Sequence, residues 1–382
     1  MAATNQLYSE IAETIRKEIH AGVYGNQLPN GKELQDRFGV SATTIRTALA
    51  LIAEDNLIVR IPGKGTFVNN KDLNTNNIYR ESDNRKGELS KKIVGIILPR
   101  LRGGVFTHLL FGALDELEKY KCNSLVGLTH SNFQRESELI REFCELGATG
   151  LVVWPSEGEQ FSDTLLRLHL SGFPVVFVDR WLPGIDMKCV RADHKGGAQQ
   201  AVRHLFELGH RHLAFLSLGS EDPENTQSVQ ERLRGFMTES LSNISSNGTT
   251  RIWMRPIQPE ETMQDHVDWL ATQFLDNQDV TAVVGVEPYD LECVRRFAQR
   301  SGQSIPKALS VVGFDAGNID PDRDKGWISF LSDMKWTWID QSEEEIGREA
   351  VRILLNDKIE TMEKSQNVIP AVLRVGDTTA LI

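Results

Sequence analysis

The stretch LPNGKELQDRFGVSATTIRTALALIAEDNLIVRIPGKGTFV, residues 28–68, decides the fold of the amino-terminal part of this chain. Apolar spacing predicts a short helix over 31–38, and Ser41 is a favourable N-cap for a second helix that follows it. Two β-rich pieces come next, at 57–61 and 65–68, and the Pro-Gly-Lys between them is typical of a hairpin turn. The stretch therefore reads as two helices followed by a β-hairpin.

The residues on either side complete this unit. Upstream, Leu7, Ile11, Ile15 and Ile19 recur at helical spacing, and glycines after them end that helix. Downstream, residues 69–91 are polar, rich in asparagine and nearly free of large apolar side chains, which predicts a linker. Three helices and a hairpin predict a winged helix-turn-helix domain over 1–69, followed by a flexible linker over 70–91.

The remaining residues, 92–382, have a different pattern. Short β-rich runs such as IVGIILP at 93–99 and LSVVGFD at 309–315 alternate with amphipathic helical patterns. This alternation predicts parallel sheets covered by helices on both faces, in an α/β, doubly wound fold of two lobes. In such sheets, ligands bind outside the carboxyl ends of the strands. We therefore expect one ligand cleft where the strand ends of the two lobes meet.

Composition and charge narrow the class of protein. The 382 residues are 40% hydrophobic and 25% charged, and no run approaches the length of a membrane span. The N-terminus has no basic start followed by an apolar run, so the expected location is the cytoplasm, with no membrane partner. The net charge is −11, but residues 1–70 carry equal numbers of acidic and basic side chains. The excess of acidic side chains therefore lies in the large carboxyl-terminal part of the chain. The first domain can still bind a polyanion.

Cysteine and histidine usage gives no metal or cofactor signal. The four cysteines are far apart and no pair has metal-ligand spacing, so we expect free, buried or half-buried thiols. His194, His204, His210 and His212 are close in sequence, but we interpret them as structural polar groups rather than metal ligands. No catalytic motif, such as a nucleophile elbow or a phosphate-binding loop, is present. We therefore expect a protein that is not an enzyme and that needs no cofactor.

Residues 28–68 resemble the winged helix of GntR-type regulators over the whole length of that motif. The resemblance implies that the helix beginning after Ser41 enters the major groove of operator DNA and that the hairpin tip approaches the sugar-phosphate backbone. Ala42 stands where that family usually has arginine, which implies a different preferred operator. The positions that match DNA contacts of the family are Lys32, Thr43, Thr44, Arg46, Lys64, Gly65 and Thr66.

Further along the chain, the telling pieces are ADHKGGAQQAVRHLFELGHRHLAFLSL (192–218), ERLRGF (231–236), LSVVGFD (309–315), IGREAVRILL (346–355) and IPAVLRVGDTTAL (369–381). Through them, residues 92–382 resemble the sugar-sensing domain of LacI-type repressors, itself periplasmic-binding-protein-like, and the combination with a GntR-type head is similar to arabinose-repressor-like regulators. The resemblance implies that Arg232 and Asp315 bind effector hydroxyls, and that Asp179 is a further pocket carboxylate. An arginine fork and a carboxylate each bind vicinal hydroxyls in a bidentate way. Val286 stands where the family often has asparagine, so Glu287 is a possible substitute. Phe106 and Trp181 are candidate aromatic groups for stacking on a sugar.

Three hypotheses about function follow. The first is a homodimeric repressor of transcription, in which a small sugar-like effector bound between the lobes changes operator affinity through allosteric coupling. The second is a cytoplasmic sugar-binding receptor whose main role is not DNA binding; the winged helix argues against it. The third, an enzyme with a regulatory head, lacks a catalytic set of residues. The sequence favours the first.

Overall fold

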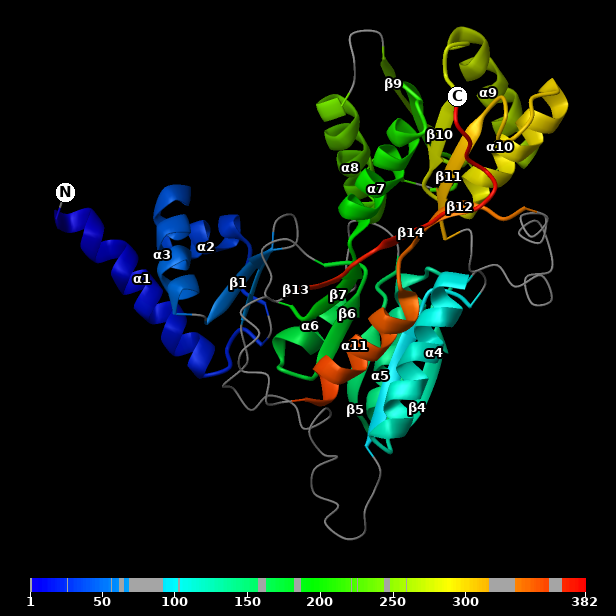
Figure 1. Ribbon diagram of the computed structural model, residues 1–382. Coiled ribbons are helices and arrows are strands. Elements are labelled where there is room, and N and C mark those ends of the chain that lie inside the picture. The colour runs from blue at the N-terminus through cyan, green and yellow to red at the C-terminus, as the bar shows by residue number, and fades with distance from the viewer. Residues whose placement is uncertain are drawn as a thin grey trace.

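A computed structural model shows a small head and two larger lobes (Figure 1). We call residues 2–68 the head, the part built on the sheet that contains β3 the first lobe, and the part built on the sheet that contains β8 the second lobe. The structure describes residues 2–25, 27–55, 57–61, 65–68, 92–101, 104–156, 163–181, 187–220, 222–224, 226–243, 248–258, 260–315, 334–356 and 366–382. The predicted linker over 70–91 lies outside these ranges.

The head has the predicted three helices and a hairpin. Its elements are α1 (Ala2–His20), α2 (Gly31–Phe38), α3 (Ala42–Glu54), β1 (Ile58–Ile61) and β2 (Gly65–Val68). Asn30 and Glu33 form a capping box at the start of α2, and Ser41 caps α3 as predicted, accepting a hydrogen bond from the Thr44 amide. Gly39 ends α2 in the left-handed conformation, which favours glycine. Local sequence therefore sets each turn of the head.

The first lobe is a six-stranded sheet in the order β13-β7-β6-β5-β3-β4, all parallel. Its helices α4 and α11 pack on each other, and α11 also contacts β5, β6 and β7. The bounds of its elements are β3 (Ile93–Leu98), α4 (Gly104–Lys119), β4 (Asn123–Leu128), α5 (Phe133–Glu145), β5 (Ala148–Val153), α6 (Asp163–Leu170), β6 (Val175–Val178), β7 (Cys189–Ala192), α11 (Glu343–Leu355) and β13 (Gln366–Ile369).

The second lobe repeats this plan with the strand order β14-β12-β11-β10-β8-β9, in which only β14 is antiparallel to its neighbour. Its helices α7 and α8 pack together, as do α9 and α10. The bounds of its elements are α7 (His194–Glu207), β8 (His212–Ser217), α8 (Gln227–Asn243), β9 (Thr249–Met254), α9 (Met263–Asp276), β10 (Ala282–Gly285), α10 (Pro288–Ser301), β11 (Ser310–Phe314), β12 (Thr337–Asp340) and β14 (Val372–Arg374).

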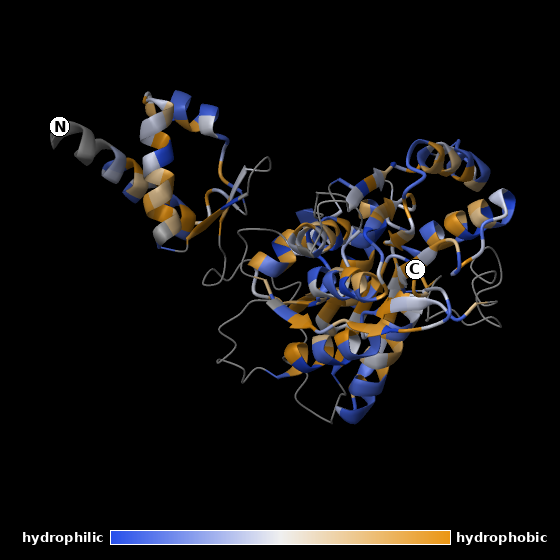
Figure 2. Ribbon diagram, turned by 45° about the horizontal axis from the view of Figure 1, so that its top comes forward, coloured by the Kyte–Doolittle hydropathy of each residue, from blue (hydrophilic) through white to orange (hydrophobic). Residues whose placement is uncertain are grey.

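The chain crosses between the lobes from β7 to α7, from β12 to α11 and from β13 to β14. The predicted α/β fold with two doubly wound lobes is thus confirmed. The inner strands are almost fully apolar because helices cover both faces of each sheet, and the exposed helix faces are polar (Figure 2). This arrangement brings the carboxyl ends of β6 and β11 toward the crossing segments.

Further findings bear on the class of protein. Within the described residues, no helix is long and apolar enough to cross a membrane, and no group of histidine, cysteine, aspartate or glutamate side chains is arranged to hold a metal ion. All four cysteines are free, with Cys122 half-buried and the other three buried. The prediction of free, buried or half-buried thiols is therefore confirmed.

Candidate functional site

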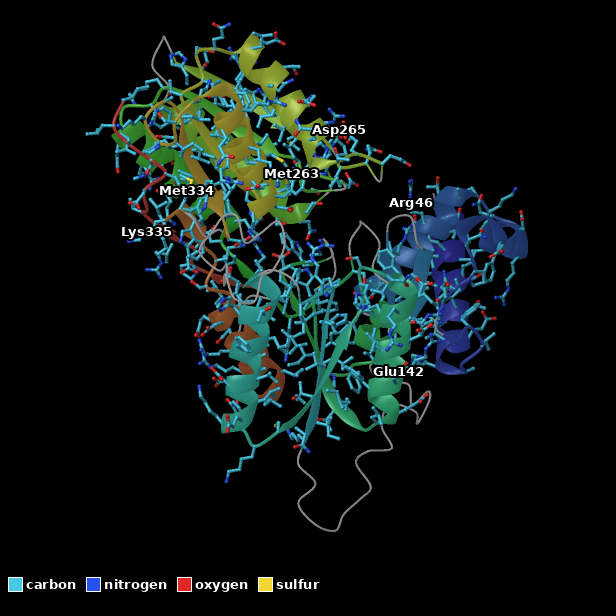
Figure 3. The ribbon with its side chains drawn as sticks, turned by 90° about the vertical axis from the view of Figure 1, so that its right-hand side faces the viewer. Arg46, Glu142, Met263, Asp265, Met334 and Lys335 are labelled. Atoms are coloured by element: carbon cyan, nitrogen blue, oxygen red, sulfur yellow. The ribbon has the colours of Figure 1, made fainter. Side chains whose placement is uncertain are left out.

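Four of the candidate DNA contacts lie on two helices of the head. Lys32 is on α2, while Thr43, Thr44 and Arg46 are on the first turns of α3. Lys32, Thr43 and Arg46 are exposed, and Thr44 is half-buried with its hydroxyl 2.9 Å from that of Ser41. Figure 3 labels Arg46 on the head. The side chains of Lys32 and Arg46 make no ion pair within the described part of the chain, so both charges are available to phosphates or base edges.

Other cations of the head hold its own structure together. Arg16 pairs with Asp55, joining α1 to the end of α3, with its Nε 2.8 Å from the carboxylate. Arg37 at the end of α2 pairs with Glu18 and also contacts the Tyr24 hydroxyl. The hydrogen bond from Arg37 lowers the pKa of Glu18, although partial burial opposes this shift. These two arginines therefore tie helices to one another, which sets them apart from Lys32 and Arg46.

The β1–β2 hairpin is the wing of the winged helix, and its exposure differs from the expectation that its tip is accessible to DNA. Gly65 is exposed and has a φ of 120°, which glycine tolerates best. Thr66, in contrast, is only 8% exposed, and its carbonyl accepts a hydrogen bond from the Leu28 amide. Lys64 lies outside the described residues. Of the two described hairpin residues that match DNA contacts of the family, Gly65 is therefore exposed to solvent and Thr66 is buried; Arg60 on the facing strand is exposed as well.

Two candidate effector residues occupy equivalent places in the two lobes. Asp179 directly follows β6 in the first lobe, and Asp315 directly follows β11 in the second. Both have a left-handed backbone, with φ values of 68° and 62°. Such conformations are uncommon for residues other than glycine and cluster at ligand sites, where the surrounding fold holds them. Each sheet thus places one aspartate side chain at the carboxyl ends of its strands, which is where the sequence predicted the ligand cleft.

A buried polar cluster connects these two carboxylates. His194 Nε2 lies 2.9 Å from Asp179 Oδ1, and His194 Nδ1 lies 3.4 Å from an Arg232 guanidinium nitrogen. The Arg232 guanidinium is in turn 4.0 Å from Asp315 Oδ2, donates to the Val286 carbonyl, and stacks 4.2 Å from the Phe314 ring centre. We call Asp179, His194, Arg232, Asp315 and Gln341 the hinge cluster, since Gln341 donates to Asp315.

The electrostatics of the hinge cluster differ between its two carboxylates. Burial raises the pKa of Asp179, but the hydrogen bond and charge of His194 and the charges of Arg180 and Arg232 outweigh it and leave that pKa lowered. Burial raises the pKa of Asp315, and the Arg232 charge only partly opposes it. The Asp179 side is thus the more firmly ionised end of the cluster.

Two polar atoms of this region are buried and have no hydrogen-bond partner among the described residues. They are Arg232 Nε and Ser217 Oγ, the latter at the carboxyl end of β8. Buried polar groups are normally satisfied, so an unsatisfied one near a cleft is the signature of a site that takes a polar ligand or water. A polyhydroxylated molecule has the donors and acceptors that such atoms require.

Trp181 lies beside the cluster in a second contact between the lobes. Its backbone amide and carbonyl both bond to the side chain of Gln227, at the start of α8. Its ring stacks with the Arg191 guanidinium at 4.5 Å, and Arg191 pairs with Glu231 of α8 at 2.6 Å. Trp181 is therefore part of a latch between the first lobe and α8, which we call the Trp181 latch.

The last two candidate effector residues have contacts outside the hinge cluster. Phe106, on α4, is buried and packs edge-to-face with Trp154, with ring centres 4.7 Å apart. Glu287 begins α10 and lies against Gly219, close enough that a side chain at Gly219 would meet its carboxylate. The fold thus brings together Asp179, Arg232 and Asp315, and places Phe106 and Glu287 at neighbouring strand ends.

His194 and Gln341 were not selected from the sequence as effector residues. His194 was grouped with three structural histidines; the structure gives it a different place from them. His210 bonds to the side chains of Thr281 and Ser310, and His204 to Thr379, within the second lobe. His194 instead begins α7, at a crossing between the lobes. The only local signal was its position directly after Asp193, the N-cap of that helix.

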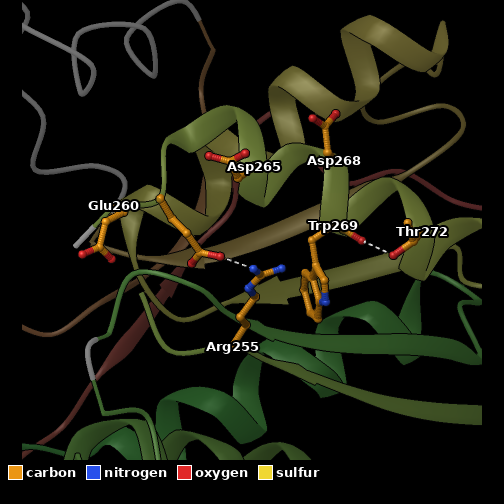
Figure 4. Close-up of a pocket in the computed structure, with 7 residues that line it drawn as sticks. Arg255, Glu260, Asp265, Asp268, Trp269 and Thr272 are labelled. Atoms are coloured by element: carbon orange, nitrogen blue, oxygen red, sulfur yellow. Dashed lines mark hydrogen bonds and ion pairs between the residues drawn. The ribbon is translucent and has the colours of Figure 1, made fainter. Parts of the chain in front are cut away.

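A separate open pocket of about 510 Å³ lies on the second lobe beside α9 (Figure 4). Two ion pairs involve its charged groups: Arg255 with Glu261, and Asp268 with Arg300. Asp265 caps α9 by accepting from the Thr262 amide and hydroxyl. Because these contacts account for every charged lining residue except Glu260, we assign the pocket to the surface structure of the second lobe.

Comparisons with known proteins agree with this geometry. Residues 7–68 match the family model "Bacterial regulatory proteins, gntR family", and residues 202–379 match the model "Periplasmic binding protein-like domain". The chain therefore combines a GntR-type helix-turn-helix domain with a periplasmic-binding-protein-like domain, and it is a DNA-binding transcriptional regulator. This regulator is 25% identical, over 89% of each chain, to the arabinose metabolism transcriptional repressor of Geobacillus stearothermophilus.

Solved structures of other regulators have a fold similar to that of this chain. A complex of the transcriptional regulator CelR with cellobiose is 19% identical, with a TM-score of 0.60 over 89% of this chain and 91% of that one. A LacI family regulator from Enterococcus faecium with bound ribose is 23% identical, with a TM-score of 0.57 over 76% of this chain and 100% of that one. Both support the assignment of two α/β lobes of the periplasmic-binding-protein type.

Proposed function

We propose that this regulator is a repressor whose affinity for operator DNA changes when a small sugar or related polyol binds between the lobes. The observation that carries the proposal is the hinge cluster, in which Asp179 of the first lobe and Arg232 and Asp315 of the second converge through His194. The proposed chain organisation is a DNA-binding domain over 1–69, a linker over 70–91 and an effector domain over 92–382. The relatives named for arabinose, cellobiose and ribose support a sugar as the effector class.

The mechanism follows from which lobe holds each group. Arg232 and Asp315 together offer a fork of donors and a carboxylate acceptor, a combination that selects vicinal hydroxyls. Asp179 offers acceptors from the opposite lobe. A polyol held by all three stabilises one angle between the lobes, because only that angle satisfies every contact. Phe106 and Trp181 are proposed to line the apolar faces of the sugar, and Glu287 the edge of the site next to Val286.

On the DNA side, we propose that α3 reads the major groove through Thr43, Thr44 and Arg46, with Lys32 on a neighbouring phosphate. We assign Lys64, Gly65 and Thr66 to the wing contact. A head without net charge gains little from non-specific attraction, so two heads on one operator are needed for useful affinity. We therefore propose a homodimer. Leu241 on α8 and Ile252 on the edge strand β9 are exposed apolar side chains suited to self-association. Its place of action is the cytoplasm, where bacterial DNA is found.

The effector is tested by thermal unfolding of the full chain against pentoses, hexoses, deoxysugars and sugar phosphates. A sugar present at about 100 times its Kd adds about 2.7 kcal/mol to the free energy of unfolding of the domain that binds it. The same sugar must fail to stabilise an Arg232→Ala variant. An Arg300→Ala variant, changed at an ion pair on the far helices of the second lobe, serves as the control and keeps the response. Absence of any response across the panel would overturn the sugar assignment.

The operator is tested by selecting duplexes from a random library with the full chain. Enriched DNA should contain a sequence related to itself by two-fold symmetry if two heads bind together. Titration with the sugar found in the unfolding assay should then change the affinity for that duplex by about 5–150-fold, the usual range for allosteric coupling. An unchanged affinity would separate DNA binding from effector binding and contradict the proposal.

A further inference from the structure

The wing of the head has an apolar face that the head itself does not cover. In the hairpin, Ile58 pairs with Val68, and both belong to the core of the head. Val59 pairs with Phe67 one step along, so this pair points to the opposite face of the hairpin. Phe67 is nevertheless only 2% exposed. Something outside the head core therefore buries it.

The partner of this face is α6 of the first lobe. Leu165 and Leu168 of α6 belong to the core of that lobe. Leu166 and Leu170, one helical turn apart, instead form a separate cluster with Phe67, and Val59 packs against it. Leu166 and Leu170 are 1% and 8% exposed. Two apolar pairs, one on the wing and one on α6, thus cover each other where the head meets the first lobe (Figure 1).

The position of α6 makes this contact informative about the effector site. It lies in the chain between β5, which is followed by Trp154 and Ser156, and β6, which is followed by Asp179. Arg180 donates to the Ser156 carbonyl at 3.3 Å, so the two segments that flank α6 are also bonded to each other at the cleft. A shift in the position of Asp179 on effector binding would therefore be transmitted to α6 through the short strand β6.

We propose that Leu166 and Leu170 of α6 form a docking surface for the wing of this chain's own head, and that docking excludes DNA from the wing. A helix with its side chains is about 10 Å wide, whereas successive strand residues are about 3.3 Å apart. Gly65 and Phe67 point to the same face of β2, two residues or about 6.6 Å apart. A helix seated on Phe67 therefore stands next to Gly65, which the resemblance assigns to DNA, and leaves no room for a duplex on that face although Gly65 itself is exposed to solvent. The exclusion of DNA rests on the proposed function, but the docking contact does not.

The docking contact is tested first without DNA, by hydrogen exchange of the full chain. A two-stranded hairpin is only marginally stable alone, so docking should slow the exchange of its amides. We expect a Leu166→Gln/Leu170→Gln variant to exchange the amides of 58–68 several-fold faster than the wild type. The matched control is Leu146→Gln, an exposed apolar residue of the first lobe, which should leave these amides unchanged.

The same exchange map reports whether the first lobe of the double variant remains folded, through the amides of β5 and β6. If those amides also lose protection, Val59→Gln on the wing gives the same test with the first lobe intact. Wing amides that exchange at the wild-type rate in a variant with a folded lobe would overturn the docking surface.

Exclusion of DNA is tested second, with the duplex selected by the full chain. If the docked state dominates without effector, the Leu166→Gln/Leu170→Gln variant should bind that duplex up to about tenfold more tightly than the wild type. The reason is that a larger fraction of the variant has its head undocked and able to bind DNA. Equal or weaker binding would overturn the exclusion of DNA while leaving the docking result in place. Failure to select any duplex would count against the proposed function and not against the exchange result.

Discussion

His194 Nε2 and Asp179 Oδ1 lie 2.9 Å apart, and together they join the first lobe to the start of the helix that carries the chain into the second. Both side chains are buried, and the other ring nitrogen of His194 faces Arg232. The imidazole therefore stands between a carboxylate of one lobe and a guanidinium of the other. Any change in the angle between the lobes must alter at least one of these two contacts.

Replacement of His194 by alanine should weaken effector binding. The change removes the partner of buried Asp179, and an unsatisfied buried carboxylate costs about 1–3 kcal/mol or more. We expect an effector Kd at least about tenfold higher, measured by calorimetry with the sugar found in the unfolding assay. His194→Gln should recover part of the loss because its amide can donate. His204→Ala, on the same helix but bonded to Thr379, is the control. Equal Kd values in the two alanine variants would contradict the assignment.

Replacement of Arg46 by alanine should abolish specific operator binding. The side chain is exposed on α3 and makes no ion pair within the described residues, so its removal costs the head no internal contact. The dependence of log affinity on log salt should become shallower by about 0.9 if Arg46 neutralises one phosphate. Fluorescence anisotropy with the selected duplex measures both. Lys17→Ala removes an exposed cation of the same head outside α3 and should keep specific binding.

The contribution of His204 and His210 to the stability of the second lobe should fall as the pH decreases from about 7.5 to 5.5. Burial lowers the pKa of His210 and of His204 below the ordinary value of 6.5. At these two histidines the unfolded state binds more protons than the folded state in this window, so their titration favours unfolding in acid, whereas the raised pKa of buried Asp290, about 8, acts in the opposite direction. His210→Gln should make the melting temperature fall less on acidification, or rise more, than that of the wild type, whatever its absolute value. His20→Gln, at an exposed position of the head, should keep the wild-type dependence; an unchanged slope in the His210 variant would refute the explanation.

Replacement of Gly347 by alanine should destabilise the first lobe. Gly347 of α11 faces α4, and an added Cβ would overlap the Leu109 carbonyl and approach the Ala113 amide to 2.8 Å. These are backbone atoms, so relief requires the two helices to separate. Overpacking of this kind costs about 1–3 kcal/mol, which urea unfolding can detect. Gly31→Ala, where an added Cβ meets nothing within 4 Å, should be close to neutral.

The secondary structure of the head was largely predictable because its signals are local. The Ser41 cap, the bounds of α2 and the strand Gly65–Val68 all appear where the sequence placed them. The short strands β7 and β9 were not singled out. Cys189–Ala192 is only four residues long, and Thr249–Met254 is an edge strand with several polar or charged residues. Their strand character depends on pairing with neighbours that are distant in the chain.

Local spacing and cap residues therefore determined the helices and the hairpin of the head, and strand–helix alternation determined the two-lobed α/β class. The tertiary structure alone decided that His194 joins Asp179 to Arg232, that Trp181 is held by Gln227 and Arg191, and that Phe67 is buried against α6. The physical reason is the distance along the chain over which each kind of interaction acts. Capping and periodicity act between residues a few positions apart, whereas these contacts join residues whose distance in space is set by how sheets, crossings and head pack together.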